Sequence, residues 1–400
     1  MPSSTIPAGG ITKFTNCRLC RDDRLDVGDL WVSSITGTIL SGQTTFFDGQ
    51  ALPDRVIDLG GRIVAPGLID VQLNGAFGFN FSTLPEDAPG GSYAKCLADV
   101  NRRLVSTGVT SYLPTLTSQK PQLYQQVLPH LRQRSQWTAN RGAEPLGAHV
   151  EGPFLNPTKN GIHDANVLRE ASSFDEIQEC YGAENLEPDR GAVKMITLAP
   201  ERGDMINLIT LFKERGIIAS IGHSEATYEI ASEAVTAGAT MITHLFNAMR
   251  PLHHRNPGIF GVLGIAEAVR RPYFGIIADG IHLHPTTVKI ASNLHPEGLI
   301  LVTDAMHMLG LPDGSYPWAN GDSQSRIVKT GPTLHLEGTD KIAGRYVLFA
   351  SRYEASMLIL AKFHYSDRMC KQLSGLVWSD NTASGKGRVD NAGYDAGMRE

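Results

Sequence analysis

Several residues that commonly bind metal ions stand in short motifs that follow apolar runs. The segment GAHVEGPF places His149 and Glu151 two residues apart on an extended run, so both side chains project to the same face. The segments GHS and THLFNAM supply His223 and His244. One carboxylate with two imidazoles suits a divalent cation such as zinc and leaves a coordination position for water. Such a cation lowers the pKa of water and polarises a carbonyl group, so the pattern favours amide hydrolysis.

A second carboxylate, Asp304 in the run LVTDA, is the candidate general base and acid. It could take a proton from an attacking water and later give it to a leaving amine. Considered alone, Asp304 is as well explained as a helix N-cap, and a single histidine is more often an ordinary hydrogen-bonded residue. Together, Glu151, the two histidines and Asp304 favour a catalytic site. His149 stands earlier in its run than Glu151, so it is either a ligand or a residue behind the metal that orients Glu151 or the water.

Two cationic groups follow in the segments PLHHRNPG and ADGIH, which contain Arg255 and His282. A guanidinium and an imidazole beside a metal ion suit a phosphate or carboxylate on the substrate. The alternative for Arg255 is a surface salt bridge, and His253 and His254 are weaker candidates.

The chain must bring these residues together, and its pattern from Ile63 onward predicts a (β/α)₈ barrel. Runs rich in β-branched residues that end in polar residues alternate with segments long enough for a helix, such as Tyr93–Ser106 and Glu225–Ala237. In such a barrel the active site lies at the C-terminal ends of the strands, where the candidates stand. A doubly wound open sheet is the alternative fold, disfavoured because there are eight runs. These runs are Ile63–Leu73, Val109–Thr115, Gly147–Glu151, Val193–Ala199, Ile217–His223, Thr240–His244, Phe274–Asp279 and Leu299–Asp304.

Residues 11–62 have a different pattern, with short apolar runs broken by Gly, Asp and Pro, and they predict part of a small β-sandwich domain. Residues 63–365 would form the barrel. Cys17 and Cys20 form a C-x-x-C motif, but without a second pair or a nearby histidine we expect strand residues rather than a zinc or redox site.

The composition limits the possible partners of the protein. A net charge of -5 without a Lys/Arg block argues against nucleic acid or an anionic membrane as the main partner. No signal peptide or apolar stretch of about 18 residues occurs. Five scattered cysteines indicate a reducing compartment, so we expect a cytoplasmic protein.

The motifs APGLIDVQLNG, HVEGPF, NGIH, IGHS, THLFNAM, HHRNPG, IADGIH and LVTDA occur in this order between Phe14 and Gly344. Together they resemble those of the N-acetylglucosamine-6-phosphate deacetylases of the amidohydrolase superfamily. The resemblance implies hydrolysis of N-acetylglucosamine 6-phosphate to glucosamine 6-phosphate and acetate. Because Gln72 and Asn74 replace the H-x-H of the wider superfamily, it also implies one principal metal ion. Its ligands would be Glu151, His223 and His244, with Asp304 as general base and acid.

The resemblance also implies a substrate site and an assembly. Arg255 and His282 would hold the 6-phosphate, and since these two can come from a neighbouring subunit we expect a homodimer. Gln72, Asn74 and His149 would lie behind the metal. The other residues expected to line the sugar-phosphate site are Ile162, Asn247, Ala248, Asp279, Gly280, Ile281, Ile342, Ala343 and Gly344.

Beyond Gly344 the chain departs from the family pattern. Arg345 to Lys371 is apolar and helix-like, residues 372–380 resemble a strand that returns to the small β domain, and residues 385–400 are expected to be disordered. The resemblance implies that a block of about fifty residues is lost or replaced, at a cost of several kcal/mol. One alternative is therefore a non-catalytic or destabilised barrel that binds metal and sugar phosphate. Another is an enzyme for a different N-acyl sugar.

Overall fold

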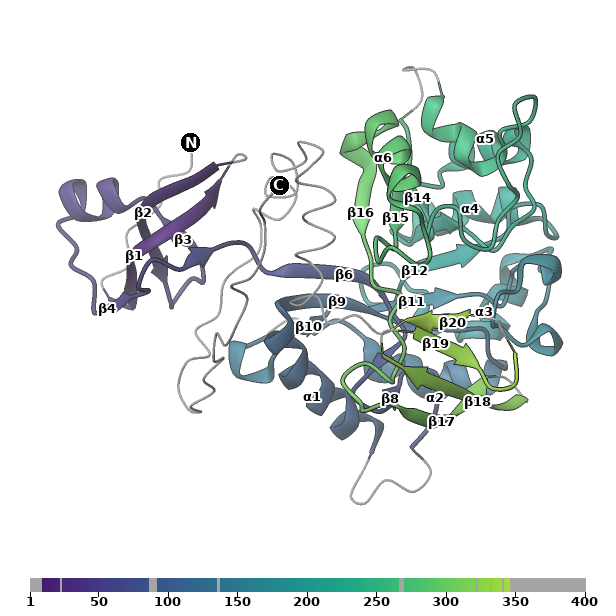
Figure 1. Ribbon diagram of the computed structural model, residues 1–400, viewed down its shortest axis with the longest axis horizontal. Coiled ribbons are helices and arrows are strands. Elements are labelled where there is room, and N and C mark those ends of the chain that lie inside the picture. The colour runs from purple at the N-terminus through teal and green to yellow at the C-terminus, as the bar shows by residue number, and fades with distance from the viewer. Residues whose placement is uncertain are drawn as a thin grey trace, which may run out of the picture.

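The computed structural model describes residues 9–21, 24–85, 92–134, 137–265, 270–320, 323–331, 333–339 and 342–345. Its main body is a barrel of eight parallel strands, in the order β6-β9-β11-β12-β13-β14-β15-β16 (Figure 1). Each of the eight predicted runs overlaps one of these strands, which confirms the predicted fold class, although β9 extends to Leu116 and β15 begins at Tyr273. Their bounds are β6 Leu68–Leu73, β9 Val109–Leu116, β11 Ala148–Glu151, β12 Val193–Leu198, β13 Ile218–Ile221, β14 Met241–Ile242, β15 Tyr273–Ile276 and β16 Leu299–Leu301. A short strand, β10 (Glu144–Pro145), also pairs with β9.

The barrel closes between β6 and the segment that follows β16. The Asn74 N–H donates to the Ala305 carbonyl at 2.8 Å, and the Asp304 N–H donates to the Gln72 carbonyl at 2.9 Å. Leu73 and Ala305 form a parallel bridge at the same place. This closure puts the polar end of β6 directly beside Asp304.

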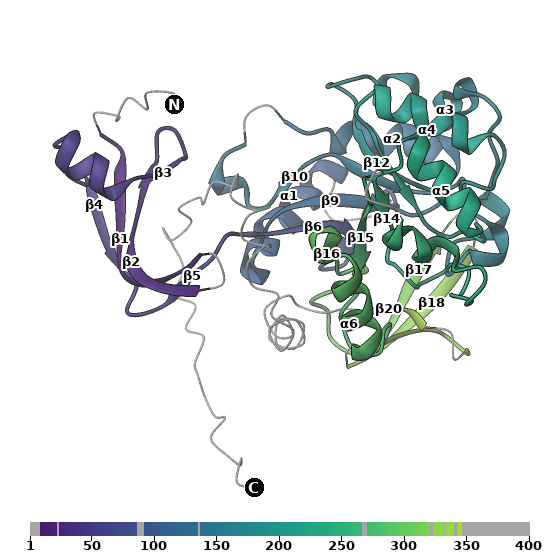
Figure 2. The same cartoon turned by 90° about the horizontal axis from the view of Figure 1, so that it is seen from above.

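Helices cover the outside of the barrel (Figure 2). In α1, the buried side chains of Leu97, Val100 and Leu104 recur every three or four residues and face the strands. The helix predicted from Glu225 begins at Tyr228, because the Thr227 side chain caps it by accepting a hydrogen bond from the Ile230 N–H. The helices are α1 Tyr93–Leu104, α2 Pro121–Leu131, α3 Phe174–Tyr181, α4 Met205–Glu214, α5 Tyr228–Ala237 and α6 Pro285–Leu294, and a 3₁₀ helix (Gly258–Gly264) connects β14 with β15.

The N-terminal segment forms a separate small sheet at one side of the barrel (Figures 1 and 2). Its order is β3-β2-β1-β4, with β5 also paired to β1. Cys17 and Cys20 lie on β1, which confirms the prediction that they are strand residues. The run predicted from Ile63 to Leu73 is divided, because Ile63–Val64 pairs with β1 while Leu68–Leu73 enters the barrel. The strands are β1 Ile11–Arg21, β2 Arg24–Ser33, β3 Ile39–Leu40, β4 Arg55–Asp58 and β5 Ile63–Val64.

A four-stranded antiparallel sheet that we did not predict follows the barrel. It consists of β17 Gly314–Asn320, β18 Ser323–Thr330, β19 Thr333–Leu336 and β20 Ile342–Arg345, each paired with the next. Trp318, Ile327 and Leu334 of this sheet pack against Met306 and Met308, just beyond Asp304. The sheet is therefore anchored to the segment that carries the candidate base.

Some predictions concern residues outside the described part of the chain. These are the barrel beyond residue 345, the returning strand at 372–380 and the tail at 385–400. In the part that is described, no helix combines the length and the apolar character needed to span a membrane.

Candidate metal centre and active site

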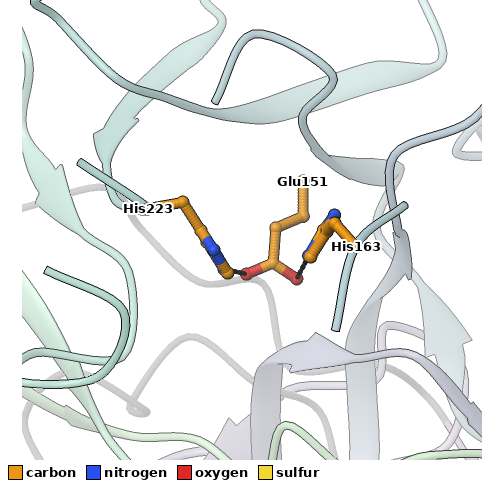
Figure 3. A group of neighbouring side chains, drawn as sticks. All are labelled: Glu151, His163 and His223. Atoms are coloured by element: carbon orange, nitrogen blue, oxygen red, sulfur yellow. Dashed lines mark hydrogen bonds and ion pairs between the residues drawn. The ribbon is translucent and has the colours of Figure 1, made fainter. Parts of the chain in front are cut away.

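The structure brings the three predicted metal ligands together at the C-terminal ends of β11, β13 and β14. Glu151 Oε1 lies 3.2 Å from His223 Nε2 and 3.1 Å from His244 Nε2. The two Nε2 atoms are 3.0 Å apart. All three residues are buried. Figure 3 shows Glu151 between His223 and a further histidine, His163.

The hydrogen bonds of His223 leave one ring nitrogen available for a cation. Its Nδ1 lies 2.7 Å from the Lys159 carbonyl oxygen. Because a carbonyl only accepts, Nδ1 carries the proton and Nε2 presents its lone pair toward Glu151. The Nε2 atom of His244 lies 3.0 Å from His223 Nε2, so a proton or a cation must lie between the two nitrogens. The three donor atoms therefore fit a divalent cation.

The electrostatics of Glu151 agree with this fit. Burial alone would raise its pKa, but when the imidazole rings are protonated, hydrogen bonds and charge from His223 and His244 hold the pKa well below its usual range. Burial also lowers the pKa of His244, and the hydrogen bond and charge of Glu151 outweigh this and raise it. The carboxylate is thus ionised in a buried site, which requires positive charge beside it.

His163 is a candidate functional residue that our sequence analysis missed. Its Nε2 lies 3.9 Å from Glu151 Oε2, and the ligand atoms of His163, Glu151 and His223 lie within 4.8 Å of one another. The Ser118 backbone N–H donates to its Nδ1 at 3.1 Å, so the neutral ring carries its proton on Nε2. Burial, followed by repulsion from His223, lowers the pKa of His163 to about 3 and keeps the ring neutral. The geometry favours a hydrogen-bond donor rather than a metal ligand.

The sequence contained a signal for His163. It ends the motif NGIH, from which only the neighbouring Ile162 was predicted to function.

His149 has both ring nitrogens engaged inside the barrel. Its Nδ1 lies 3.1 Å from the Val71 carbonyl oxygen, and its Nε2 lies 2.7 Å from the Thr197 hydroxyl. Burial lowers its pKa to about 4. Of the two roles considered for His149, the geometry therefore disfavours metal ligation.

Asp304 lies beside the cluster and is held by two side-chain amides. Its Oδ1 accepts hydrogen bonds from Asn74 Nδ2 at 2.7 Å and from Gln72 Nε2 at 3.2 Å. The Gln72 amide also donates to Glu151 Oε1 at 3.0 Å, so it links the two carboxylates. Burial, followed by the charge of Glu151, raises the pKa of Asp304 to about 6. A carboxyl group with a pKa near neutrality suits acid–base catalysis.

Both predicted histidine ligands and Asp304 have an unusual backbone conformation, as has Ala248, whose φ is +48°. The φ angles are +48° at His223, +27° at His244 and +49° at Asp304. Residues other than glycine seldom adopt positive φ, and such strain concentrates at functional sites. The side chains of His223, His244 and Asp304 therefore each project from a sharp turn that follows the end of a strand.

One predicted substrate-binding segment follows His244 closely in the chain, and a second lies after β15. Asn247 Nδ2 donates to the His244 carbonyl at 3.3 Å, and the Ala248 carbonyl accepts from the Ser224 N–H at 3.2 Å. In the segment after β15, His282 Nδ1 lies 2.6 Å from Asp279 Oδ2. Burial raises the pKa of Asp279, but the hydrogen bond and charge of His282 outweigh this and lower it. Gly280 and Ile281 form the turn between these two residues.

The remaining predicted residues lie on a turn, in the apolar cluster beside the sheet β17–β20, and on β20 itself. Arg255 is exposed on a turn, and within the described ranges its side chain makes no hydrogen bond or ion pair. Ile162 packs against the apolar cluster of the sheet β17–β20. Ile342, Ala343 and Gly344 lie on β20, whose backbone pairs with β19.

Comparisons with known proteins agree with this geometry. The Amidohydrolase family model matches residues 63–327. The N-acetylglucosamine-6-phosphate deacetylases of Danio rerio and Homo sapiens are each 42% identical to the chain, over 86% and 84% of it and 82% and 78% of their own lengths. The structure is similar to the crystal structure of N-acetylglucosamine-6-phosphate deacetylase from Pasteurella multocida, with a TM-score of 0.70 and 26% identity. That match covers 90% of this chain and 88% of the other.

Proposed function

The chain belongs to the amidohydrolase family and, within it, to the N-acetylglucosamine-6-phosphate deacetylases, and we propose that it hydrolyses N-acetylglucosamine 6-phosphate. The products are glucosamine 6-phosphate and acetate. The observation that carries this proposal is the convergence of Glu151, His223 and His244 beside Asp304.

Glu151, His223 and His244 would hold one divalent metal ion, for which we propose zinc because it favours imidazole and carboxylate ligands. When bound, such an ion supplies Lewis acidity, which acidifies water and polarises the amide carbonyl. His163 presents an N–H group to the same site.

Asp304 performs the proton transfers in this proposal. Its carboxylate, held by Asn74 and Gln72, accepts a proton from the attacking water. It then gives that proton to the amine nitrogen as the amide bond breaks. A pKa of about 6 leaves most of this carboxyl group ionised at neutral pH and still able to carry the proton.

We further propose that Arg255 and His282 bind the 6-phosphate. Because the Arg255 side chain is exposed, we assign it to the site of a neighbouring subunit in a homodimer. The other predicted lining residues complete the sugar site, namely Ile162, Asn247, Ala248, Asp279, Gly280, Ile281, Ile342, Ala343 and Gly344. We place the protein in the cytoplasm because its cysteines are few and scattered.

The proposal is tested by measuring acetate release from N-acetylglucosamine 6-phosphate by metal-loaded and metal-stripped protein. Asp304→Asn should lower kcat by about 10²- to 10⁴-fold and retain the metal. Arg255→Ala should raise KM for the 6-phosphate and leave the rate with unphosphorylated N-acetylglucosamine unchanged. Folded, metal-loaded wild-type protein that binds the sugar phosphate without releasing acetate would show that the barrel is a binding protein.

A further inference from the structure

Asp70 is a buried carboxylate for which the proposed reaction has no direct use. It lies on β6, two residues before Gln72, and is 0% exposed. Burial raises its pKa to about 7. In the described part of the chain no Lys, Arg or His forms an ion pair with it. A carboxylate in this environment is costly to bury, so its contacts indicate what it does.

The Asp70 side chain accepts hydrogen bonds from two residues in the described part of the chain. One is Gln72, which belongs to the proposed active site, and the other is Thr303, which precedes Asp304. Its Oδ1 accepts the backbone N–H groups of Gln72 at 3.2 Å and Thr303 at 3.3 Å. Its Oδ2 accepts a hydrogen bond from the Thr303 hydroxyl. A carboxylate accepts all three donors at once, whereas an asparagine side chain would present an N–H group to one of them.

The Thr303 hydroxyl connects Asp70 with the turn at Asp304. Because it donates to Asp70, its lone pairs are free to accept, and the Ala305 N–H donates to it at 3.2 Å. That bond spans Asp304, whose φ is +49°. A side-chain bond from one residue to the N–H two positions later stabilises a tight turn of this kind.

We propose that Asp70 is a positioning residue of the hydrolytic site, which acts through Thr303 to hold the Asp304 carboxylate against Gln72 and Asn74. This inference rests on the function proposed above, because it gives Asp70 a role only through Asp304.

The alternative is that Asp70 only closes the barrel. Besides a 3.4 Å contact of the Thr303 hydroxyl with the Gln72 carbonyl, the seam between β6 and the segment after β16 has two bonds, from the Asn74 N–H to Ala305 and from the Asp304 N–H to Gln72. Both join backbone atoms and remain when the Thr303 hydroxyl is removed. Substitution of Thr303 thus separates positioning from closure.

The experiment compares Thr303→Val, which removes the hydroxyl and keeps the shape, with Thr303→Ser, which keeps the hydroxyl. Thr303→Val should lower kcat by about 10- to 100-fold, since small misplacements of a reacting group cost rates of this order, with KM and metal content unchanged. Thr303→Ser should retain most of kcat. Thr107→Val is the matched control, because the buried Thr107 hydroxyl donates to the Leu104 carbonyl at the end of α1, outside the site.

A crystal structure of Thr303→Val tests the positioning role without an activity measurement. The Asp304 carboxylate should leave hydrogen-bonding distance of Asn74 Nδ2. An unmoved carboxylate, a wild-type kcat, or a loss of kcat that only follows loss of metal would overturn the proposal. Failure of the deacetylase function looks different, because the metal-loaded wild type would then release no acetate.

Discussion

The barrel and the N-terminal sheet distribute polar and apolar side chains in opposite ways. At the strand ends of the barrel, charged Glu151 is only 2% exposed and His244 3%. In the N-terminal sheet domain, apolar Val27 is 86% exposed and Phe47 69%. The barrel buries groups that water would stabilise, which is a common sign of a functional site. The N-terminal domain leaves apolar groups in contact with water.

This difference indicates that the reaction takes place in the barrel and not in the N-terminal sheet. The described part of the N-terminal sheet has a small apolar core, centred on Phe14 and Leu30, and no buried cluster of acidic residues and histidines. The barrel contains every predicted metal ligand and the candidate base. We therefore expect changes in the barrel to affect turnover and changes in the sheet to affect only its own stability.

The largest expected effect comes from His223, compared with His149 in the barrel interior. His223→Asn should abolish stoichiometric metal binding and lower kcat by more than the roughly 10- to 100-fold typical of residues behind metal ligands. His149→Asn should retain the metal, because both nitrogens of His149 face other protein groups. Elemental analysis and acetate release measure the two effects. Equal metal loss in both variants would contradict the assignment of the ligands.

A smaller effect is expected from pH. Asp304 must be ionised to accept a proton, and its raised pKa is about 6. As the pH falls through this value the base becomes protonated, so kcat/KM should fall by about tenfold per unit at lower pH. A cation bound beside Asp304 would lower its pKa, so this decline should begin at pH 6 or below. A profile without an acidic limb at any pH at which the protein stays folded and metal-loaded would rule out Asp304 as the base.

The smallest effect on turnover is expected in the N-terminal sheet. Phe14→Ala removes a buried ring, 2% exposed, and should destabilise the sheet by about 3–5 kcal/mol. Phe47→Ala, at an exposed ring, should change stability by no more than about 0.5 kcal/mol. Hydrogen exchange of the β1 amides measures both, and kcat should stay at the wild-type value. A large loss of kcat in a folded, metal-loaded variant would show that the sheet contributes to the site.

Much of the barrel could be predicted from sequence because its signals are local. Runs of β-branched residues mark the strands, and parallel strands direct their polar ends to one face. That geometry was enough to expect Glu151, His223, His244 and Asp304 near one another, as the structure has them. The sheet β17–β20 was missed because eight runs already accounted for a complete barrel.

The rest depends on contacts between residues distant in sequence. The Ser118 N–H that fixes the tautomer of His163 is 45 residues away from it, and Asp70 and Thr303 are 233 residues apart. The positive φ angles at His223, His244 and Asp304 also had no signal, because these residues are not glycines. Sequence patterns indicate which side chains converge, and tertiary packing decides which atoms they present.

Anomalous X-ray diffraction from zinc-loaded crystals tests the central claim most directly. One peak per subunit should lie about 2.0–2.2 Å from Glu151 Oε1, His223 Nε2 and His244 Nε2, with His163 outside the coordination sphere. A peak coordinated by His163 Nε2 in place of His244, or no peak in well-ordered crystals, would contradict the account.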